Sequence, residues 1–163
     1  MIIFIIILSL ILENIVSNIV PLGSVFTPLF SIVSLVLIYP FFNNNDLRYI
    51  KYCGVVGLIY DIIFTNTLFL NMIVFMAVGL IIKLINFTLS NNFINVMIIT
   101  LISIVMYLII TYFILVIIGY KNFNIDYLTI TILKTLLLNI IYSFIMYIIA
   151  DKLSEKHKIQ KID

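Results

Sequence analysis

Tryptophan is missing from this sequence, and its 163 residues include a single cysteine and a single histidine. One cysteine, Cys53, cannot form an internal disulfide, and one histidine, His157, cannot supply a Cys/His cluster for zinc or haem. The sequence also has no glycine-rich phosphate loop and no nucleophile beside a base. We therefore expect no cofactor, no metal and no enzymatic activity, and we interpret Cys53 as a small packing residue.

Charge is scarce as well: 10% of the residues are charged and 64% are hydrophobic. Such a composition excludes a soluble domain and gives no reason to expect a nucleic-acid partner. A transmembrane helix needs about 20 apolar residues, so this length allows about six spans with short loops. The expected fold is all-α: a polytopic integral membrane protein with six transmembrane helices in a compact bundle.

The chain is expected to form one membrane domain, residues 1–163. The spans are predicted at about 2–20, 26–42, 52–68, 69–87, 93–119 and 127–150, followed by a charged cytoplasmic tail, 151–163. Spans three and four should form an antiparallel hairpin because their connection is short. Span five carries no charge and is expected to be the helix most exposed to lipid. The apolar start of the chain lacks a basic region and a cleavage site, so no signal peptide is predicted.

The positions of the basic residues predict the orientation in the membrane. With both termini in the cytoplasm, seven basic residues face inward: Arg48, Lys51, Lys83, Lys152, Lys156, Lys158 and Lys161. The outer side then receives only Lys121. Because cytoplasmic loops carry the excess of lysine and arginine, we expect both termini inside.

The stretch 54–71 places one carboxylate, Asp61, in a run that is otherwise apolar enough for lipid. A charge near the bilayer centre is costly, so such a residue normally faces protein or water and has a partner. On a helix, Gly54, Gly57, Asp61 and Thr65 share one face. Small residues let helices approach closely in membranes, so this face is expected to contact neighbouring helices.

Two further ionisable residues lie inside predicted spans. Glu13 belongs to a polar stripe of span one, and two interpretations stay open: it lies near the outer interface in water, or it faces inward with a structural role. Lys134 is expected on an inward face of span six with Thr135 and Asn139. Lys134 and Asp61 fall at similar depth, so we expect them to pair, with Glu13 or the asparagines of span one as alternative partners for Asp61.

These three residues also allow a transport interpretation. Intramembrane charges mark ion pathways by default, so Asp61, Glu13 and Lys134 could form a proton or ion relay. In so small a bundle, a buried pair that fixes the helix register is favoured instead.

One motif in span three resembles a known family. The sequence Gly57-Leu58-Ile59-Tyr60-Asp61-Ile62-Ile63, followed by Thr67-Leu68-Phe69-Leu70-Asn71, resembles the rod shape-determining protein MreD family. That family carries a glycine and an aspartate four residues apart in its third span, followed by a Leu-Gly-x-Asn-like turn. Gly57, Asp61, Leu68 and Asn71 occupy the matching positions. Phe69 stands where the family has the turn glycine.

The resemblance implies a non-enzymatic membrane scaffold of the bacterial cell-elongation (rod) complex, which supports cell shape and peptidoglycan synthesis. It implies a location in the cytoplasmic membrane among lipids, with MreC as partner and, through it, MreB and the peptidoglycan polymerase and transpeptidase. The alternative is a substrate-binding membrane component of an energy-coupling-factor-type vitamin importer. Those components usually show an Ala-x-x-x-Ala docking pattern on the first span, and here only Ala77 and Ala150 occur.

Overall fold

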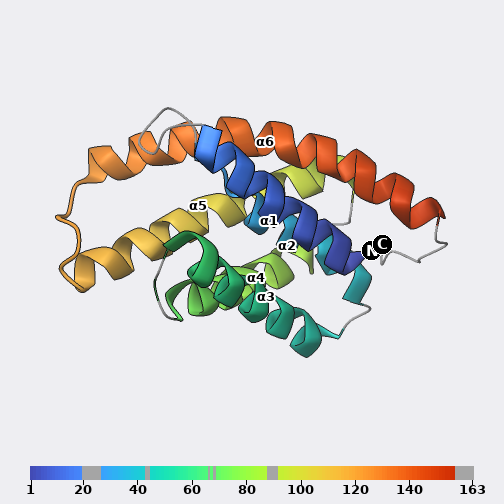
Figure 1. Cartoon of the computed structure of the whole chain (residues 1–163), viewed down its shortest axis with the longest axis horizontal. Coiled ribbons are helices and arrows are strands. Elements are labelled where there is room, and N and C mark those ends of the chain that lie inside the picture. The colour runs from blue at the N-terminus through green and yellow to red at the C-terminus, as the bar shows by residue number, and fades with distance from the viewer. Residues whose placement is uncertain (20–26, 43–44, 66, 68, 88–91, 157–163) are drawn as a thin grey trace.

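The computed structural model is helical throughout its regular segments; it describes residues 1–19, 27–42, 45–65, 67, 69–87 and 92–156. Figure 1 shows α1 (Ile2–Ile19), α2 (Phe30–Ile38), α3 (Asp46–Tyr60), α4 (Leu70–Asn86), α5 (Phe93–Ile117) and α6 (Ile125–Lys156). A 3₁₀ turn, η1 (Tyr39–Phe42), follows α2, and a π-helical turn, η2 (Asp61–Thr65), follows α3. Leu68 of the motif and the tail residues 157–163 lie outside the described residues.

The helices pack as three consecutive hairpins, α1 with α2, α3 with α4, and α5 with α6. The start of α1 and the end of α6 lie at the same end of the molecule, on the right in Figure 1. Met1 lines a small cavity there together with Phe41 and Tyr52, so η1 and the start of α3 reach the same end. The end of α3 and the start of α4 lie toward the other end.

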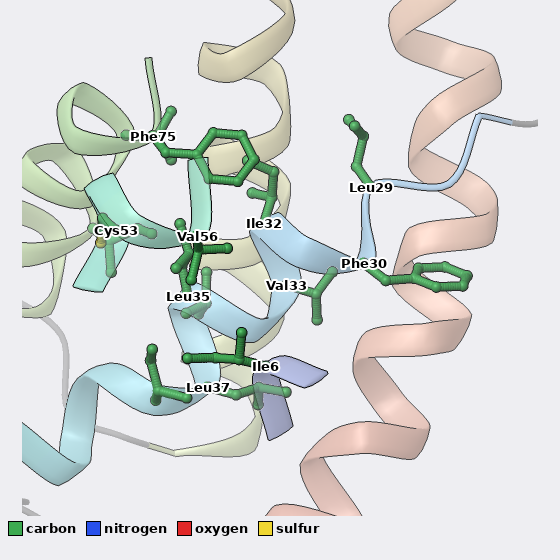
Figure 2. Close-up of a cluster of buried hydrophobic side chains, with 14 of the residues drawn as sticks. Ile6, Leu29, Phe30, Ile32, Val33, Leu35, Leu37, Cys53, Val56 and Phe75 are labelled. Atoms are coloured by element: carbon green, nitrogen blue, oxygen red, sulfur yellow. The ribbon is translucent and has the colours of Figure 1, made fainter. Parts of the chain in front are cut away.

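Helix α2 forms the centre of the bundle. All nine of its residues are buried, and it packs on α1, α4, α5 and α6. Figure 2 shows Phe30 pointing toward α6, where it stacks on Tyr142 with ring centroids 3.8 Å apart. Together α2 and η1 span only about 20 Å. Because the other helices surround this segment, it does not need to match the thickness of the bilayer.

Helix α3 begins at Asp46, six residues before the predicted start of span three at about 52. The Asn45 side chain accepts a hydrogen bond from the backbone N–H of Arg48 (3.4 Å) and caps the helix. The carboxylate of Asp46, in the first turn, interacts favourably with the positive end of the helix dipole. The charged residues of this segment therefore form a helix start. Asp46 also pairs with Lys83 of α4 at 2.8 Å.

Glycines bring α3 and α4 into close contact along their length. A Cβ added at Gly57 would lie 2.8 Å from the Cα of Met72, and one at Gly79 would lie 2.6 Å from the Cys53 sulfur. Gly54 faces the flexible side chain of Met76. The expectation that the small face of this helix contacts its neighbour is confirmed, and Cys53 is a buried packing residue.

The expectation that α5 is the most lipid-exposed helix is wrong. It packs on α2, α4 and α6, and α6 exposes more large hydrophobic side chains than α5 does. Its buried face includes Thr100, Ser103 and Tyr107, at three- and four-residue spacing. Small and hydroxyl-bearing side chains at that spacing give an uncharged helix an inward face.

Much of the outer surface of the molecule is apolar. Exposed large hydrophobic side chains occur on every helix except the buried α2, for example Leu133 (65%) and Leu137 (57%) on α6. Among the described residues, α1, α5 and 125–153 of α6 are long and apolar enough to cross a membrane, and α2 with η1 and α4 are shorter apolar helices. Such a surface is suited to lipid, so the chain is a membrane protein.

Candidate functional site at the turn between α3 and α4

The candidate site is built around Asp61, where α3 changes from α-helical to π-helical winding. Single π-helical turns are rare and often mark functional sites, because they redirect the side chains that follow. The Asp61 side chain is only 2% exposed. The turn that follows is short, and α4 starts nine residues after Asp61, at Leu70.

Both oxygens of the Asp61 carboxylate accept hydrogen bonds from the turn and from the start of α4. Oδ1 accepts from the Thr67 hydroxyl (2.5 Å), the Asn71 backbone N–H (3.1 Å) and the Asn71 side-chain amide (2.9 Å). Oδ2 accepts from the backbone N–H of Met72 (3.1 Å). The Thr65 hydroxyl lies 3.2 Å from Oδ1. Every partner is a donor, which is the set that an ionised carboxylate takes.

This arrangement makes Asp61 the N-terminal cap of α4. The residue in the cap position itself, Phe69, makes no side-chain cap hydrogen bond. The first N–H groups of a helix have no partner within it, and an anion near them also interacts favourably with the helix dipole. Asp61 supplies both contributions from the preceding helix. The buried charge is thereby stabilised without a cationic side chain.

Asn71 extends the network to α5. Its side-chain amide donates to Asp61 and also to the Thr65 hydroxyl (3.1 Å), and its Oδ1 accepts from the Tyr107 hydroxyl (2.9 Å). Asn71 is 2% exposed and Tyr107 is 6% exposed. The glycine, aspartate and asparagine of the motif therefore act together: Gly57 permits close approach, Asp61 caps α4, and Asn71 ties both helices to α5.

The backbone conformation of Phe69 explains why the family has a glycine at this position of the turn. Its φ is +65°, the left-handed region, and it is the only non-glycine residue with positive φ in the described part of the chain. A residue with a Cβ is strained there by about 1–2 kcal/mol, whereas glycine is not. The tight turn is therefore kept despite the phenylalanine, at the cost of local backbone strain.

Glu13 has a similar structural position in the first hairpin. It is fully buried, and its Oε2 accepts a hydrogen bond from the backbone N–H of Ser31 at 2.7 Å, at the start of α2. The cap residue of α2, Leu29, has no side-chain cap of its own, but its N–H donates to Asn139 of α6 (2.8 Å). Of the two interpretations left open, the structure agrees with the inward-facing one.

The expectation that Lys134 faces inward and pairs with Asp61 is wrong. Lys134 is exposed on α6, and none of the Asp61 hydrogen bonds described above involves it. The inward face of α6 instead carries Thr135, Asn139 and Tyr142, all buried. Successive residues on a helix differ by about 100°, so Lys134 lies on a different face from Thr135. Neither Glu13 nor the asparagines of span one supplies the partner.

Tyr107 and Tyr112 were not predicted from the sequence as members of the buried polar network. The Tyr112 hydroxyl bonds to the backbone of Asn124 (2.9 Å to its carbonyl), and the Asn124 side chain accepts from the N–H of Tyr127 (3.0 Å) at the start of α6. In each of the three hairpins, then, a polar side chain of the first helix binds the backbone near the start of the second. The available signal was the spacing of Tyr107, Thr111 and Tyr112 along a helix without charges.

The site is suited to holding helices together. Both oxygens of the Asp61 carboxylate accept hydrogen bonds from the turn and from α4. Among the described residues no group of three or more His, Cys, Asp or Glu side chains could hold a metal ion. The chemistry of this cluster is hydrogen bonding between neutral donors and one carboxylate.

The apolar surface and the hairpins closed by buried polar side chains define a class, the helical integral membrane proteins. Within that class the chain matches the family model for rod shape-determining protein MreD over residues 1–157 and belongs to that family. The resemblance inferred from the span-three motif is thereby confirmed. Neither the curated proteins nor the solved structures gave a match. The family is a structural one associated with rod shape, so the chain has a role in rod-shape determination.

Proposed function

We propose that the chain is a non-enzymatic scaffold of the cell-elongation complex in the bacterial cytoplasmic membrane, where it supports cell shape and peptidoglycan synthesis. The observation that carries the proposal is the family match over residues 1–157. The site is consistent with it, because the motif residues Gly57, Asp61 and Asn71 bind parts of the same bundle. A rigid bundle of this kind offers a fixed surface to partner helices.

The proposal includes six membrane-spanning helices with both termini in the cytoplasm. The ends of the helices support it, because the start of α1 and the end of α6 lie at one end of the molecule (Figure 1). The Lys83–Asp46 pair brings the start of α3 and the last turn of α4 together. Arg48 and Lys51 lie on the first turns of the same α3. Basic residues at the end that carries both termini agree with the positive-inside rule.

The proposed partners are MreC and, through it, MreB filaments and the peptidoglycan polymerase and transpeptidase, together with membrane lipids. The loops are short, so contact with a membrane partner has to run through helix surfaces. Helix α6 presents a suitable one, a row of exposed apolar side chains, Leu133, Leu137, Ile141 and Ile148. Exposed apolar rows on membrane helices serve lipid and partner helices alike.

In vivo photocrosslinking tests that surface. A photoreactive residue at Leu137 should give a crosslink to MreC or the synthase, and one at Ile11, exposed on α1, serves as the matched control. The partner surface is rejected if Ile11 gives the crosslink and Leu137 does not.

Depletion in the native host tests the function itself. Loss of the chain should turn rods into round cells and disperse new peptidoglycan insertion, and re-expression should restore both. Cells that stay rod-shaped but lose uptake of a vitamin would contradict the scaffold proposal and favour the importer alternative.

A further inference from the structure

A cavity of about 530 Å³ opens beside the Asp61 network, between the α3–α4 turn and the second half of α5. The residues that line it are Thr65, Thr67, Leu70, Asn71, Tyr107, Thr111, Leu115, Ile118 and Tyr120. We call it the turn cavity. Six of these nine side chains carry a hydroxyl or an amide, a high share for a protein whose outer surface is largely apolar.

One polar atom in the turn cavity lacks a hydrogen-bond partner among the residues that the structure describes. The Thr111 hydroxyl oxygen is buried and makes no hydrogen bond among the described residues. Buried polar groups are nearly always bonded, and an exception needs an explanation. Asn71 and Tyr107, bonded to each other beside it, add further polar atoms to the same wall.

The charge around the turn cavity indicates what kind of group it accepts. Its described lining has no cationic side chain, and the Asp61 carboxylate lies directly behind Asn71. The nearby Lys121 instead lies over the ring of Tyr127, 4.9 Å from its centroid. An anionic headgroup would be repelled by Asp61, and no cationic side chain among the described residues lines the turn cavity itself. A neutral group with several hydroxyls matches the hydroxyls and amide present.

The shape of the rim indicates an amphiphile. Leu115 and Ile118 form an apolar wall that continues onto the outer surface, where Ile118 is 68% exposed. Tyr120, 79% exposed at the rim, offers a flat ring to the apolar face of a sugar. We propose that the turn cavity binds the sugar headgroup of a neutral glycolipid, with its acyl chains along the exposed end of α5. This site is independent of the proposed scaffold function.

Photolabelling of the purified chain in phosphatidylcholine nanodiscs tests the site. One sample contains a photoactivatable monoglucosyl diacylglycerol and the other contains phosphatidylglycerol with the same photoactivatable chain, at equal mole fraction. The glucosyl lipid should label the residues of the turn cavity several-fold more than the anionic lipid does. An excess of methyl glucoside should leave this labelling intact, because the free sugar lacks the apolar contacts.

Two variants locate the binding contact. Thr111→Val removes a hydroxyl that makes no hydrogen bond among the described residues, so it should leave the fold intact. It should reduce labelling about three- to tenfold, the loss of one hydrogen bond. Tyr120→Ala should reduce labelling as well, because it removes the ring that contacts the sugar. The fold should persist, because the Tyr120 side chain is exposed. Thr129→Val is the control, because Thr129 is exposed on α6 and bonds only the carbonyl of Ile125; it should label as the wild type does.

Several results would overturn the proposal. Equal labelling by the two lipids would show an ordinary lipid annulus. Labelling mapped to other helices, or unchanged in both Thr111→Val and Tyr120→Ala, would remove the site. Displacement by methyl glucoside would show that the sugar alone suffices, which contradicts the role of the apolar wall.

Discussion

At the scale of single residues, two buried acids accept hydrogen bonds from backbone N–H groups at helix starts. Asp61 accepts from the N–H groups of Asn71 and Met72 at the start of α4, and Glu13 accepts from that of Ser31 at the start of α2. The same N–H groups would otherwise lack partners in an apolar environment. Each acid therefore satisfies a need of the helix that follows it.

Substitution of Asp61 tests the cap. Asp61→Leu leaves the N–H groups of Asn71 and Met72 without an acceptor in the interior, and we expect a loss of about 3–5 kcal/mol in unfolding free energy. Asp61→Asn keeps one acceptor oxygen and should cost about 1–2 kcal/mol. Unfolding in detergent with increasing denaturant measures both. Equal losses for the two variants would contradict the capping role.

Phe69 should be a site of easy stabilisation. Phe69→Gly relieves the strain of the left-handed backbone and should raise the thermal unfolding midpoint by a few degrees, about 1 kcal/mol. Phe69→Ala is the matched control, because alanine loses the ring but keeps the Cβ and so keeps the strain. If alanine stabilises as much as glycine does, the ring and not the backbone is the cause.

At the scale of elements, the α3–α4 hairpin is held at both ends. Asp61 caps α4 at the turn, and the Asp46–Lys83 pair joins the helices at the other end. Between them the glycines set the distance. The pair is partly exposed, so it contributes little on its own; close packing and the cap account for most of the stability of the hairpin.

The two glycines of α3 should differ in their tolerance of alanine. At Gly57 the new Cβ meets the backbone of α4, which cannot move without separating the helices, so Gly57→Ala should cost about 2–3 kcal/mol. At Gly54 it meets the Met76 sulfur at 3.1 Å, and that flexible side chain can move aside. Gly54→Ala should cost under about 1 kcal/mol. Comparison of the unfolding midpoints decides, and a larger loss at Gly54 would contradict the packing described.

Lys134 gives a double-mutant test of the corrected pairing. Because Lys134 is exposed and takes no part in the Asp61 hydrogen bonds described above, Lys134→Met should change stability by no more than about 0.5 kcal/mol. Combined with Asp61→Leu, its effect should add to that of the single change. Recovery of stability in the double variant would restore the ion pair that the structure does not show.

At the scale of the whole molecule, composition and length were enough to predict a helical membrane bundle, and the motif was enough to predict the family. The close contact between α3 and α4 also followed from Gly54, Gly57 and Asp61 on one face. The partners of Asp61 could not be predicted, because two of them are backbone N–H groups, which every residue except proline has. Lys134 was misplaced by one position, which on a helix is a rotation of about 100°.

Two further features were not predicted from the sequence: the burial of α2 and the position at which α3 starts. Nothing in an apolar run of nine residues distinguishes a helix surrounded by protein from one in lipid. The segment from Asp46 to Lys51 has the charges of a loop, and only its cap at Asn45 identifies it as the start of a helix. Tertiary packing decides the first case, and the local cap decides the second.

Reporter fusions test the proposed topology. A reporter that is active only in the cytoplasm should be active when fused after Asp163 and silent when inserted in residues 120–126. The physical reason is the excess of basic residues on the side that holds both termini. Activity in the 120–126 loop together with silence at Asp163 would reverse the orientation.

The central claim is that the Asp61 motif holds the scaffold together and does no chemistry of its own. The most direct test uses depleted cells that express either the wild-type chain or Asp61→Asn at matched abundance in the membrane. The measured quantity is the cell width. We expect Asp61→Asn to restore rod shape as well as the wild type once abundance is equal, because the capped hairpin persists. Round cells at equal abundance and with a folded variant would contradict the claim and give the carboxylate a direct role.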